Sequence, residues 1–205
     1  MGRTSDARER LMDAVLSLMW EESYGAVTID DICRRAAVKK GSFYYFFESK
    51  SDLSIAALER LWAEQWKPRL DAQFSTSIRP LGRIVGYLEG LYEKQAESKR
   101  KLGKVLGCPV CSLGSEVSTQ DEKLSAKVRE ICGRKRLYLE SAIRDAVADG
   151  SIEPCDPIEK AASLAGLIEG VVGQGRIMND PEIIRSLSLM ALDFLRPRSG
   201  VPAVA

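Results

Sequence analysis

The chain of 205 residues contains no histidine, and this absence limits the chemistry that is open to it. Histidine is the usual proton shuttle of enzymes and the commonest metal ligand in proteins. The sequence also lacks the Gly-x-Gly-x-x-Gly and P-loop patterns that bind nucleotides. A single Cys-x-x-Cys, at Cys108 and Cys111, has no second pair to complete a zinc site and lies in no βαβ context. We therefore predict that the chain is not an enzyme and holds no metal or other cofactor.

Long apolar runs are also missing. No stretch approaches the roughly 18 apolar residues of a membrane span, and the N-terminus is charged rather than apolar. Five cysteines, an odd number, argue against a disulfide framework and fit a reducing compartment. The formal net charge is only +1, and residues 1–53 hold eight Lys and Arg against nine Asp and Glu. We expect a cytoplasmic protein without membrane contact, in which any attraction to nucleic acid comes from the local arrangement of charges.

Apolar residues recur at helical spacing along almost the whole chain. The series Leu11, Val15 and Leu18 gives one apolar stripe near the start, and no segment shows the alternation of a strand. Hydrophobic residues make up 45% of the chain, enough for a buried core. The pattern predicts an all-α fold of about nine helices. We expect a three-helix headpiece over residues 1–50, a helical body over residues 51–198 and a disordered tail over residues 199–205.

The stretch from Thr28 to Lys50 is the most informative part of the chain. Thr28 is followed three residues later by Asp31, the spacing of a capping box at the start of a short helix. The run Ala36-Ala37-Val38 leaves room only for a tight turn before a second short helix. Within that helix Phe43 and Phe47 are four residues apart, so they share a face that can pack on the first helix. Two short helices joined by such a turn form a helix-turn-helix.

The second short helix carries hydrogen-bond donors on its remaining faces. Lysines supply charge to phosphates and donate to guanine, and hydroxyl groups bond phosphates or base edges. Gly41 costs about 1 kcal/mol of helix propensity relative to alanine. Its presence favours a role in which the backbone of this helix approaches a partner closely. A plain core helix is the alternative, but it would not leave two tyrosines and a glycine beside the charges. The exposed candidates are Lys39, Lys40, Ser42, Tyr44 and Tyr45.

Residues from about Arg8 to Leu53 resemble the DNA-binding domain of the TetR family of bacterial repressors. The resemblance rests on Val27-Thr28-Ile29, on the run Ala-Ala-Val-Lys-Lys-Gly-Ser-Phe-Tyr-Tyr-Phe-Phe at 36–47, and on Ser-Lys-Ser-Asp-Leu at 49–53. It implies that residues 1–50 bind DNA, and that residues 51–198 bind a ligand and dimerise. It further implies phosphate contacts by Thr28, Tyr44, Tyr45 and Lys50, with Lys39, Lys40 and Ser42 nearest the base edges.

Three positions depart from the family's pattern. Ala37 stands where the family usually has glycine, at a turn position that can require positive φ, at a cost of about 1 kcal/mol to alanine. Lys39 replaces the usual serine or threonine cap, which weakens the helix start but adds a charge. Phe46 lacks the hydroxyl or imidazole often found at its position, so we assign it no phosphate contact.

The resemblance implies a homodimer, because members of this family pair through their last two helices in a four-helix bundle. Two headpieces can then read a palindrome in successive major grooves. Burial within one subunit is the alternative for these helices, which are apolar on more than one face. The candidate interface residues are Leu164, Leu167, Ile168, Val171, Ile184, Leu187 and Phe194.

The resemblance also implies an effector site in the body. Aromatic and flexible side chains suit a hydrophobic small molecule, although ordinary core packing is the alternative for each of them. Cys108 and Cys111 additionally leave a redox-sensing pair open. The candidate lining residues are Trp62, Trp66, Tyr87, Tyr92, Cys108 and Met178. The sequence thus predicts a ligand-responsive repressor that binds a double-stranded operator and is released by its effector.

Overall fold

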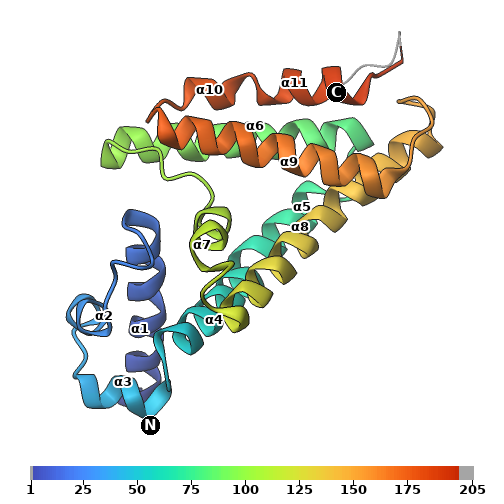
Figure 1. The fold of residues 1–205 in the computed structure, drawn as a ribbon. Helices are drawn as coiled ribbons and strands as arrows, with labels where there is room; N and C mark the ends of the chain where they lie inside the picture. Colours follow the sequence, from blue (N-terminus) through green and yellow to red (C-terminus); the bar gives the residue numbers. More distant parts are fainter. Residues whose placement is uncertain (1, 199–205) are drawn as a thin grey trace. The chain divides into compact units, whose positions relative to one another are not determined.

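The computed structural model describes residues 2–198, with side chains from Asp6 onward, and the predicted disordered tail at 199–205 lies outside the described residues. Helices make up most of the described chain (Figure 1). Its elements are α1 (Gly2–Glu21), α2 (Ile29–Ala36), α3 (Lys40–Phe46), α4 (Lys50–Leu61), the π-helical η1 (Trp62–Trp66), α5 (Lys67–Gln73), α6 (Pro80–Leu102), α7 (Pro109–Val117), α8 (Glu122–Ala148), α9 (Pro157–Ile177), α10 (Glu182–Arg185) and α11 (Leu187–Leu195).

The prediction of an all-α fold is confirmed. In residues 2–198, α4, η1 and α5 follow one another without a break, and Ser186 both ends α10 and begins α11. Counted in this way, the described helices form nine continuous segments, as the sequence pattern indicates. The only β-pairing recorded in this part of the chain is an isolated bridge between Ile152 and Pro197. No helix within the same residues is long and apolar enough to cross a membrane.

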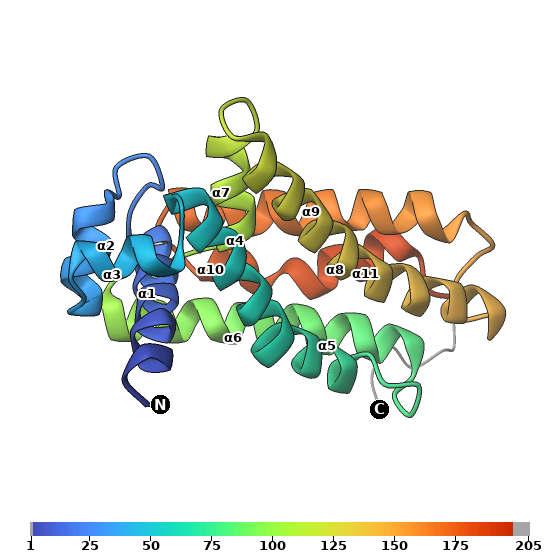
Figure 2. The ribbon, with the colours of Figure 1, turned by 90° about the horizontal axis from the view of Figure 1, so that it is seen from below.

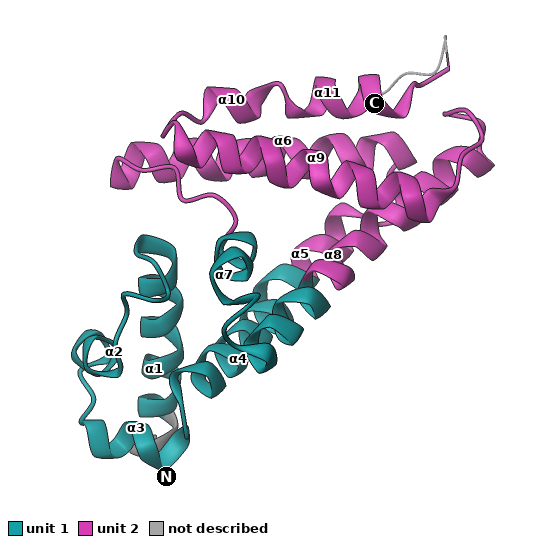
Figure 3. Ribbon diagram, viewed as in Figure 1, with its two compact units in different colours: residues 1–67, 109–131 teal, residues 68–108, 132–205 magenta. Residues whose placement is uncertain are grey.

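Contacts between residues divide the chain into two compact units (Figure 3). Unit 1 comprises residues 1–67 and 109–131, and unit 2 comprises residues 68–108 and 132–205. The division therefore falls after Lys67, and unit 1 recruits α7 and the start of α8 from much later in the chain. This division into compact units does not test which residues bind DNA. That residues 1–50 bind DNA and residues 51–198 bind a ligand and dimerise stays a prediction.

In unit 1, α1 forms the wall on which the other short helices pack. It contacts α2, α3 and α4, and its apolar stripe is fully buried. Polar contacts fix the same packing, since Arg10 Nη1 donates to the carbonyl of Ala36 at 3.1 Å and Arg35 pairs with Glu21 at 3.1 Å. The largest completely buried side chains of this core include Leu11, Met12, Ile32, Phe43, Leu53 and Leu58.

Unit 2 is built around α6, α9 and the α10–α11 segment, and this last segment contacts both α6 and α9 (Figure 2). Helix α9 begins at Pro157, whose fixed φ suits a first helical position, behind the capping carboxylate of Asp156. Arg83 is buried and donates to Asp145 Oδ2 at 2.5 Å and to the carbonyl of Ile78 at 2.7 Å, which ties the start of α6 to α8. The core cluster includes Ile84, Leu88, Ile143, Leu164, Ile184 and Leu187.

The turn between α2 and α3 has the geometry that the sequence predicts. Thr28 Oγ1 accepts from the Asp31 N–H at 3.1 Å, and Asp31 Oδ2 accepts from the Thr28 N–H at 3.0 Å, so the capping box is confirmed. Helix α2 ends at Ala37, which is left-handed with φ 52° and ψ 44°. The N–H of Val38 then donates to the carbonyl of Cys33 at 3.0 Å and closes the helix end. Alanine is thus held in a conformation that favours glycine.

Replacing Ala37 with glycine should stabilise the protein, because glycine adopts this conformation without a Cβ penalty. We expect Ala37→Gly to raise the free energy of unfolding by about 1 kcal/mol in a urea titration. Ala36→Gly is the matched control: Ala36 is helical and buried, so that change should lower stability by about 1 kcal/mol. A destabilised Ala37→Gly protein would contradict the assigned turn.

Candidate DNA interface

Helix α3 has seven residues, and the buried ring of Phe43 anchors it in the core of unit 1. Phe43 is fully buried, and its ring contacts those of Tyr44 and Phe47, with centroids 5.2 Å and 6.1 Å away. The next two positions turn outward, since Tyr44 is 54% exposed and Tyr45 is 75% exposed. The helix therefore has an anchored side and an accessible side, which the recognition helix of a helix-turn-helix requires.

The two lysines at the start of α3 are both exposed but have different surroundings. Lys39 occupies the N-cap position, where its side chain makes no capping hydrogen bond. Lys40 Nζ lies 2.8 Å from Asp30 Oδ1, and its hydrogen bond to Asp30 raises its pKa. Exposed ion pairs of this kind contribute little to stability and are easily exchanged. The pair with Asp30 therefore holds Lys40 only weakly, and the contact of Lys40 with a base edge stays a prediction.

The backbone of α3 is accessible at Gly41. A Cβ placed on this glycine meets no other atom within 4 Å, so the position faces open space. Ser42, beside it, is half-buried within the same helix. We call the exposed set Lys39, Lys40, Gly41, Tyr44 and Tyr45 the recognition face. The structure brings together on this short rod all of the predicted base-reading residues and the two predicted tyrosines.

Thr28 and Lys50 also make contacts within the protein, apart from their predicted phosphate contacts. Thr28 is exposed, but its hydroxyl already serves the capping box of α2. Lys50 Nζ donates to the carbonyls of Tyr24 at 2.8 Å and Val27 at 2.7 Å, and it lies 4.0 Å from the Tyr24 ring centroid. Burial lowers the pKa of Lys50 and raises that of Tyr24 to about 12. Lys50 thus secures the loop before α2, and its contact with phosphate stays a prediction.

A carboxylate from α7 holds the same loop. Glu116 Oε2 accepts hydrogen bonds from the Gly25 N–H and the Ser23 hydroxyl, each at 3.0 Å. Sequence reasoning missed this residue, because 91 positions separate Glu116 from Gly25 and no local pattern links them. The loop that leads into α2 is therefore held from both sides, by Lys50 and by Glu116.

The predicted effector residues fall in both units. Trp62 is buried and Trp66 half-buried in unit 1, whereas Tyr87, Tyr92, Cys108 and Met178 belong to unit 2. The Tyr92 hydroxyl donates to Glu182 at 2.9 Å and accepts from Arg185 at 2.7 Å, so it joins α6 to α10. Met178 is 64% exposed at the end of α9. Contact of any of the six with a ligand stays a prediction.

The predicted dimer residues do not share one face. Four of them, Leu164, Ile168, Ile184 and Leu187, lie in the buried core of unit 2, so they offer almost no surface to a second chain. The part of these four residues in a dimer interface stays a prediction, and α9 and α11 are apolar on several faces, so spacing alone does not identify the inner one. Leu167, Val171 and Phe194 are half-buried and keep accessible surface. The exposed apolar side chains of these helices are Ile158, Ile177, Leu189 and Met190.

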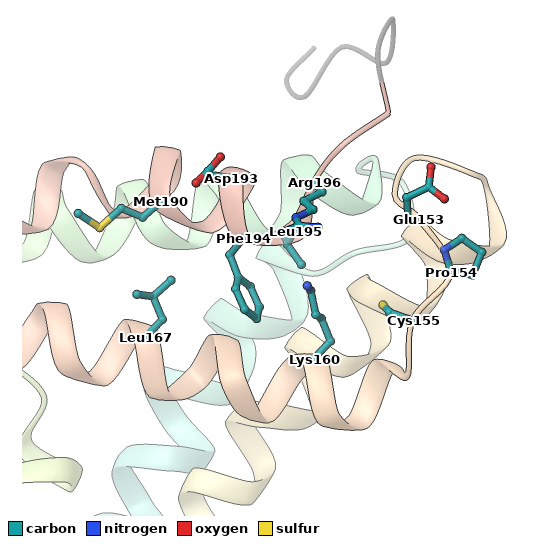
Figure 4. A pocket seen from close by; sticks show the side chains of 10 residues that line it. All are labelled: Glu153, Pro154, Cys155, Lys160, Leu167, Met190, Asp193, Phe194, Leu195 and Arg196. Carbon is teal, nitrogen blue, oxygen red and sulfur yellow. The ribbon is translucent and has the colours of Figure 1, made fainter.

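An open groove of about 690 Å³ lies between α9 and α11 (Figure 4). Leu167, Met190 and Phe194 supply its apolar surface, and Lys160 Nζ lies 4.0 Å from the Phe194 ring centroid. The remaining lining residues are Glu153, Pro154, Cys155, Asp193, Leu195 and Arg196. Leu167, Met190 and Phe194 therefore border a concave surface, whereas Ile158, Ile177 and Leu189 do not line it.

Comparison with known proteins identifies both parts of the chain. Residues 11–57 match the family described as bacterial regulatory proteins, tetR family, and residues 87–188 match the tetracyclin repressor-like C-terminal domain. The transcriptional regulator AcuR of Cereibacter sphaeroides is 27% identical over 89% of this chain and 82% of its own length. An HTH-type regulator in the lacX 3' region of Lactococcus lactis is 28% identical, over 62% of each protein. The crystal structure of the reduced form of E. coli NemR has a TM-score of 0.81 at 23% identity, covering 95% of this chain and 99% of that one.

Replacing Gly41 with alanine tests whether the α3 backbone contacts DNA, because the change should weaken DNA binding without impairing folding. The free protein has space for the new methyl group, and alanine favours helix by about 1 kcal/mol, so the free energy of unfolding should rise slightly. Binding to operator DNA should weaken about tenfold or more if the α3 backbone approaches the groove closely. Fluorescence anisotropy with labelled DNA measures this. Unchanged affinity in a stabilised protein would show that Gly41 does not contact the duplex.

Proposed function

Because the chain belongs to the TetR family of bacterial regulatory proteins, we propose that it represses transcription as a homodimer bound to a palindromic operator. It is a transcriptional regulator with an N-terminal DNA-binding domain, and it is not an enzyme. The observation that carries the proposal is the recognition face: a short helix, anchored by a fully buried Phe43, that exposes two lysines, two tyrosines and an open glycine backbone.

Each residue of the recognition face has a role in this proposal. Lys40 exchanges Asp30 for a guanine in the major groove, and Lys39 supplies a second charge at the start of the same helix. The hydroxyls of Tyr44 and Tyr45 donate to phosphates and fix the register of the helix on the duplex. Ser42 stands between these groups. Thr28 and Lys50 act at the edge of the interface, where they also hold the loop that positions α2.

The proposed dimer uses the outer surfaces of α9 and α11. Ile158, Leu189 and Met190 are 56%, 70% and 44% exposed, and exposed apolar side chains gathered on two neighbouring helices mark an interface. A second copy related by a twofold axis presents the same surface, so each partner can fill the groove beside Phe194 in the other. Leu167, Val171 and Phe194 remain the members of the predicted set with area to contribute.

Release from DNA is proposed to follow binding of an effector in the body. A ligand that binds more tightly to the conformation that does not fit the operator shifts the population away from DNA. A coupling of 1–3 kcal/mol between the two sites is sufficient. The site of action is then the cytoplasm, where the operator is located.

Replacing Lys40 with alanine should weaken operator binding and relax base preference. We expect a loss of about tenfold or more against the specific site, a much smaller loss against unrelated DNA, and little change in the salt slope, because a contact with guanine neutralises no phosphate. The DNA flanking the protein's own coding region serves as the specific site. Lys101→Ala is the matched control, since Lys101 is also an exposed lysine paired with an acid, Glu97, at 2.6 Å. Equal behaviour of the two variants would refute the assignment.

Replacing Asp30 with asparagine should have the opposite effect. The change removes a carboxylate that pairs with Lys40 and would repel phosphates, so affinity for all duplex DNA should rise several-fold at low salt. Glu97→Gln, which removes the partner of Lys101, should leave affinity unchanged. Weaker binding by Asp30→Asn would mean that Asp30 positions Lys40 in the complex rather than competing with DNA for it.

A further inference from the structure

The loop that leads into α2 contains a β-turn with glycine at its third position. The Ala26 N–H donates to the Ser23 carbonyl at 3.1 Å, so the turn comprises Ser23, Tyr24, Gly25 and Ala26. The peptide group between Tyr24 and Gly25 lies at its centre. Reversal of this central peptide group interconverts turns of types I and II. Its orientation therefore decides which neighbours its carbonyl and its N–H can reach.

Opposite charges hold the two ends of the central peptide group. Lys50 Nζ donates to the Tyr24 carbonyl at 2.8 Å, and Glu116 Oε2 accepts from the Gly25 N–H at 3.0 Å. The carbonyl and the N–H of a trans peptide point in opposite directions, so this placement of the ammonium and the carboxylate matches the peptide dipole. A reversed peptide would direct its carbonyl toward Glu116 and its N–H toward Lys50. The two charges therefore favour the observed orientation.

Each of the two charged groups has a further contact with the same loop. Lys50 Nζ also donates to the Val27 carbonyl at 2.7 Å, and Glu116 Oε2 also accepts from the Ser23 hydroxyl at 3.0 Å. Burial lowers the pKa of Lys50, and the negative charge of Glu116 partly offsets that effect, so the two groups interact with each other as well. All of these contacts lie within unit 1 (Figure 3).

Glycine at position 25 makes the reversed turn accessible. Gly25 does not have a positive φ in the structure, which excludes the type II orientation. A type II turn requires a positive φ at this third position, and glycine meets that requirement without a steric penalty. The sequence of the turn therefore permits both orientations, and the contacts of Lys50 and Glu116 select one of them.

The orientation of the turn bears on the candidate DNA interface because Thr28 follows Gly25 by only three residues. Thr28 is the N-cap of α2, and the side chain of Val27 directly before it is buried. Helix α2 in turn packs on α1 and α3. A reversed turn would displace the start of α2, and with it the support of α3.

We propose that Glu116 is a positioning residue for DNA binding: together with Lys50 it fixes the Tyr24–Gly25 peptide group and so sets the start of α2 relative to α1. This inference rests on the DNA-binding role in the proposed function. Glu116 acts through the loop and not through a contact with DNA. Electrostatics alone predicts an effect of the opposite sign, since loss of a carboxylate from a DNA-binding unit should raise affinity for DNA.

Binding of full-length variants to labelled DNA from the region flanking the coding sequence tests the proposal. Glu116→Ala should weaken binding about tenfold, because the turn loses its hydrogen bonds to a charged group and can reverse. Glu116→Gln should bind within about threefold of the wild type, since its amide oxygen can still accept from the Gly25 N–H. Glu122→Ala is the matched control: Glu122 is an exposed acid of unit 1 that pairs with Arg129 at 2.6 Å, and its loss should not weaken binding.

Replacing Gly25 with alanine in the Glu116→Ala protein should restore binding to near that of the wild type. Alanine fits the observed turn, because its Cβ would meet Ser23 Oγ at 3.7 Å and Glu116 Oε2 at 3.9 Å in the wild type, both ordinary contact distances. The reversed turn would require a positive φ, which alanine disfavours. Gly133→Ala is the control for stability alone: it removes a glycine from α8, where a Cβ meets no atom within 4 Å, and should not restore binding.

Three results would overturn the proposal: affinity of Glu116→Ala equal to or above that of the wild type, a loss that Gly25→Ala does not restore, or a loss that Gly133→Ala restores equally well. Urea unfolding confirms that each variant is folded. Hydrogen exchange of the Gly25 amide, followed by NMR without DNA, should be faster in Glu116→Ala than in the wild type, and unchanged exchange would also overturn the proposal. Failure of the proposed function would appear instead as a wild type that does not bind the operator, while exchange at Gly25 still reports on its contact with Glu116.

Discussion

The left-handed turn at Ala37 is the constraint on which the candidate DNA interface depends. Without it α2 would continue, and α3 could not leave its axis within the three residues available. The turn fixes the direction of α3, and the buried ring of Phe43 fixes how closely α3 packs on the core of unit 1. Together they leave Lys40, Tyr44 and Tyr45 accessible. A non-glycine residue in this conformation is strained, so the surrounding packing must hold it in place. Arg10 contributes to that packing through its bond to the Ala36 carbonyl.

Features that depend on neighbours in the sequence could be predicted from it. The capping box of Thr28 and Asp31, the turn at Ala37 and the anchoring of Phe43 each involve residues a few positions apart. The all-α fold follows in the same way from apolar spacing. At Pro68, which lacks a backbone N–H, the helix continues through α5, and the π-helical turn of η1 comes directly before α5.

Features that depend on distant parts of the chain could not be predicted. The partners of Lys50 are backbone carbonyls 26 and 23 residues earlier, and Glu116 reaches the same loop from α7. Leu164 and Leu187 lie on helices with apolar residues on several faces, so their burial inside one subunit follows only from the packing of α11 on α6 and α9.

The central claim is that α3 enters the major groove of the operator twice per dimer. Protection of guanine N7 from dimethyl sulfate reports on the major groove directly, since N7 is exposed there. The account predicts two protected clusters on operator DNA, about 34–36 Å apart along the helix axis. Protection confined to adenine N3 in the minor groove, or a single cluster at saturating protein, would contradict it.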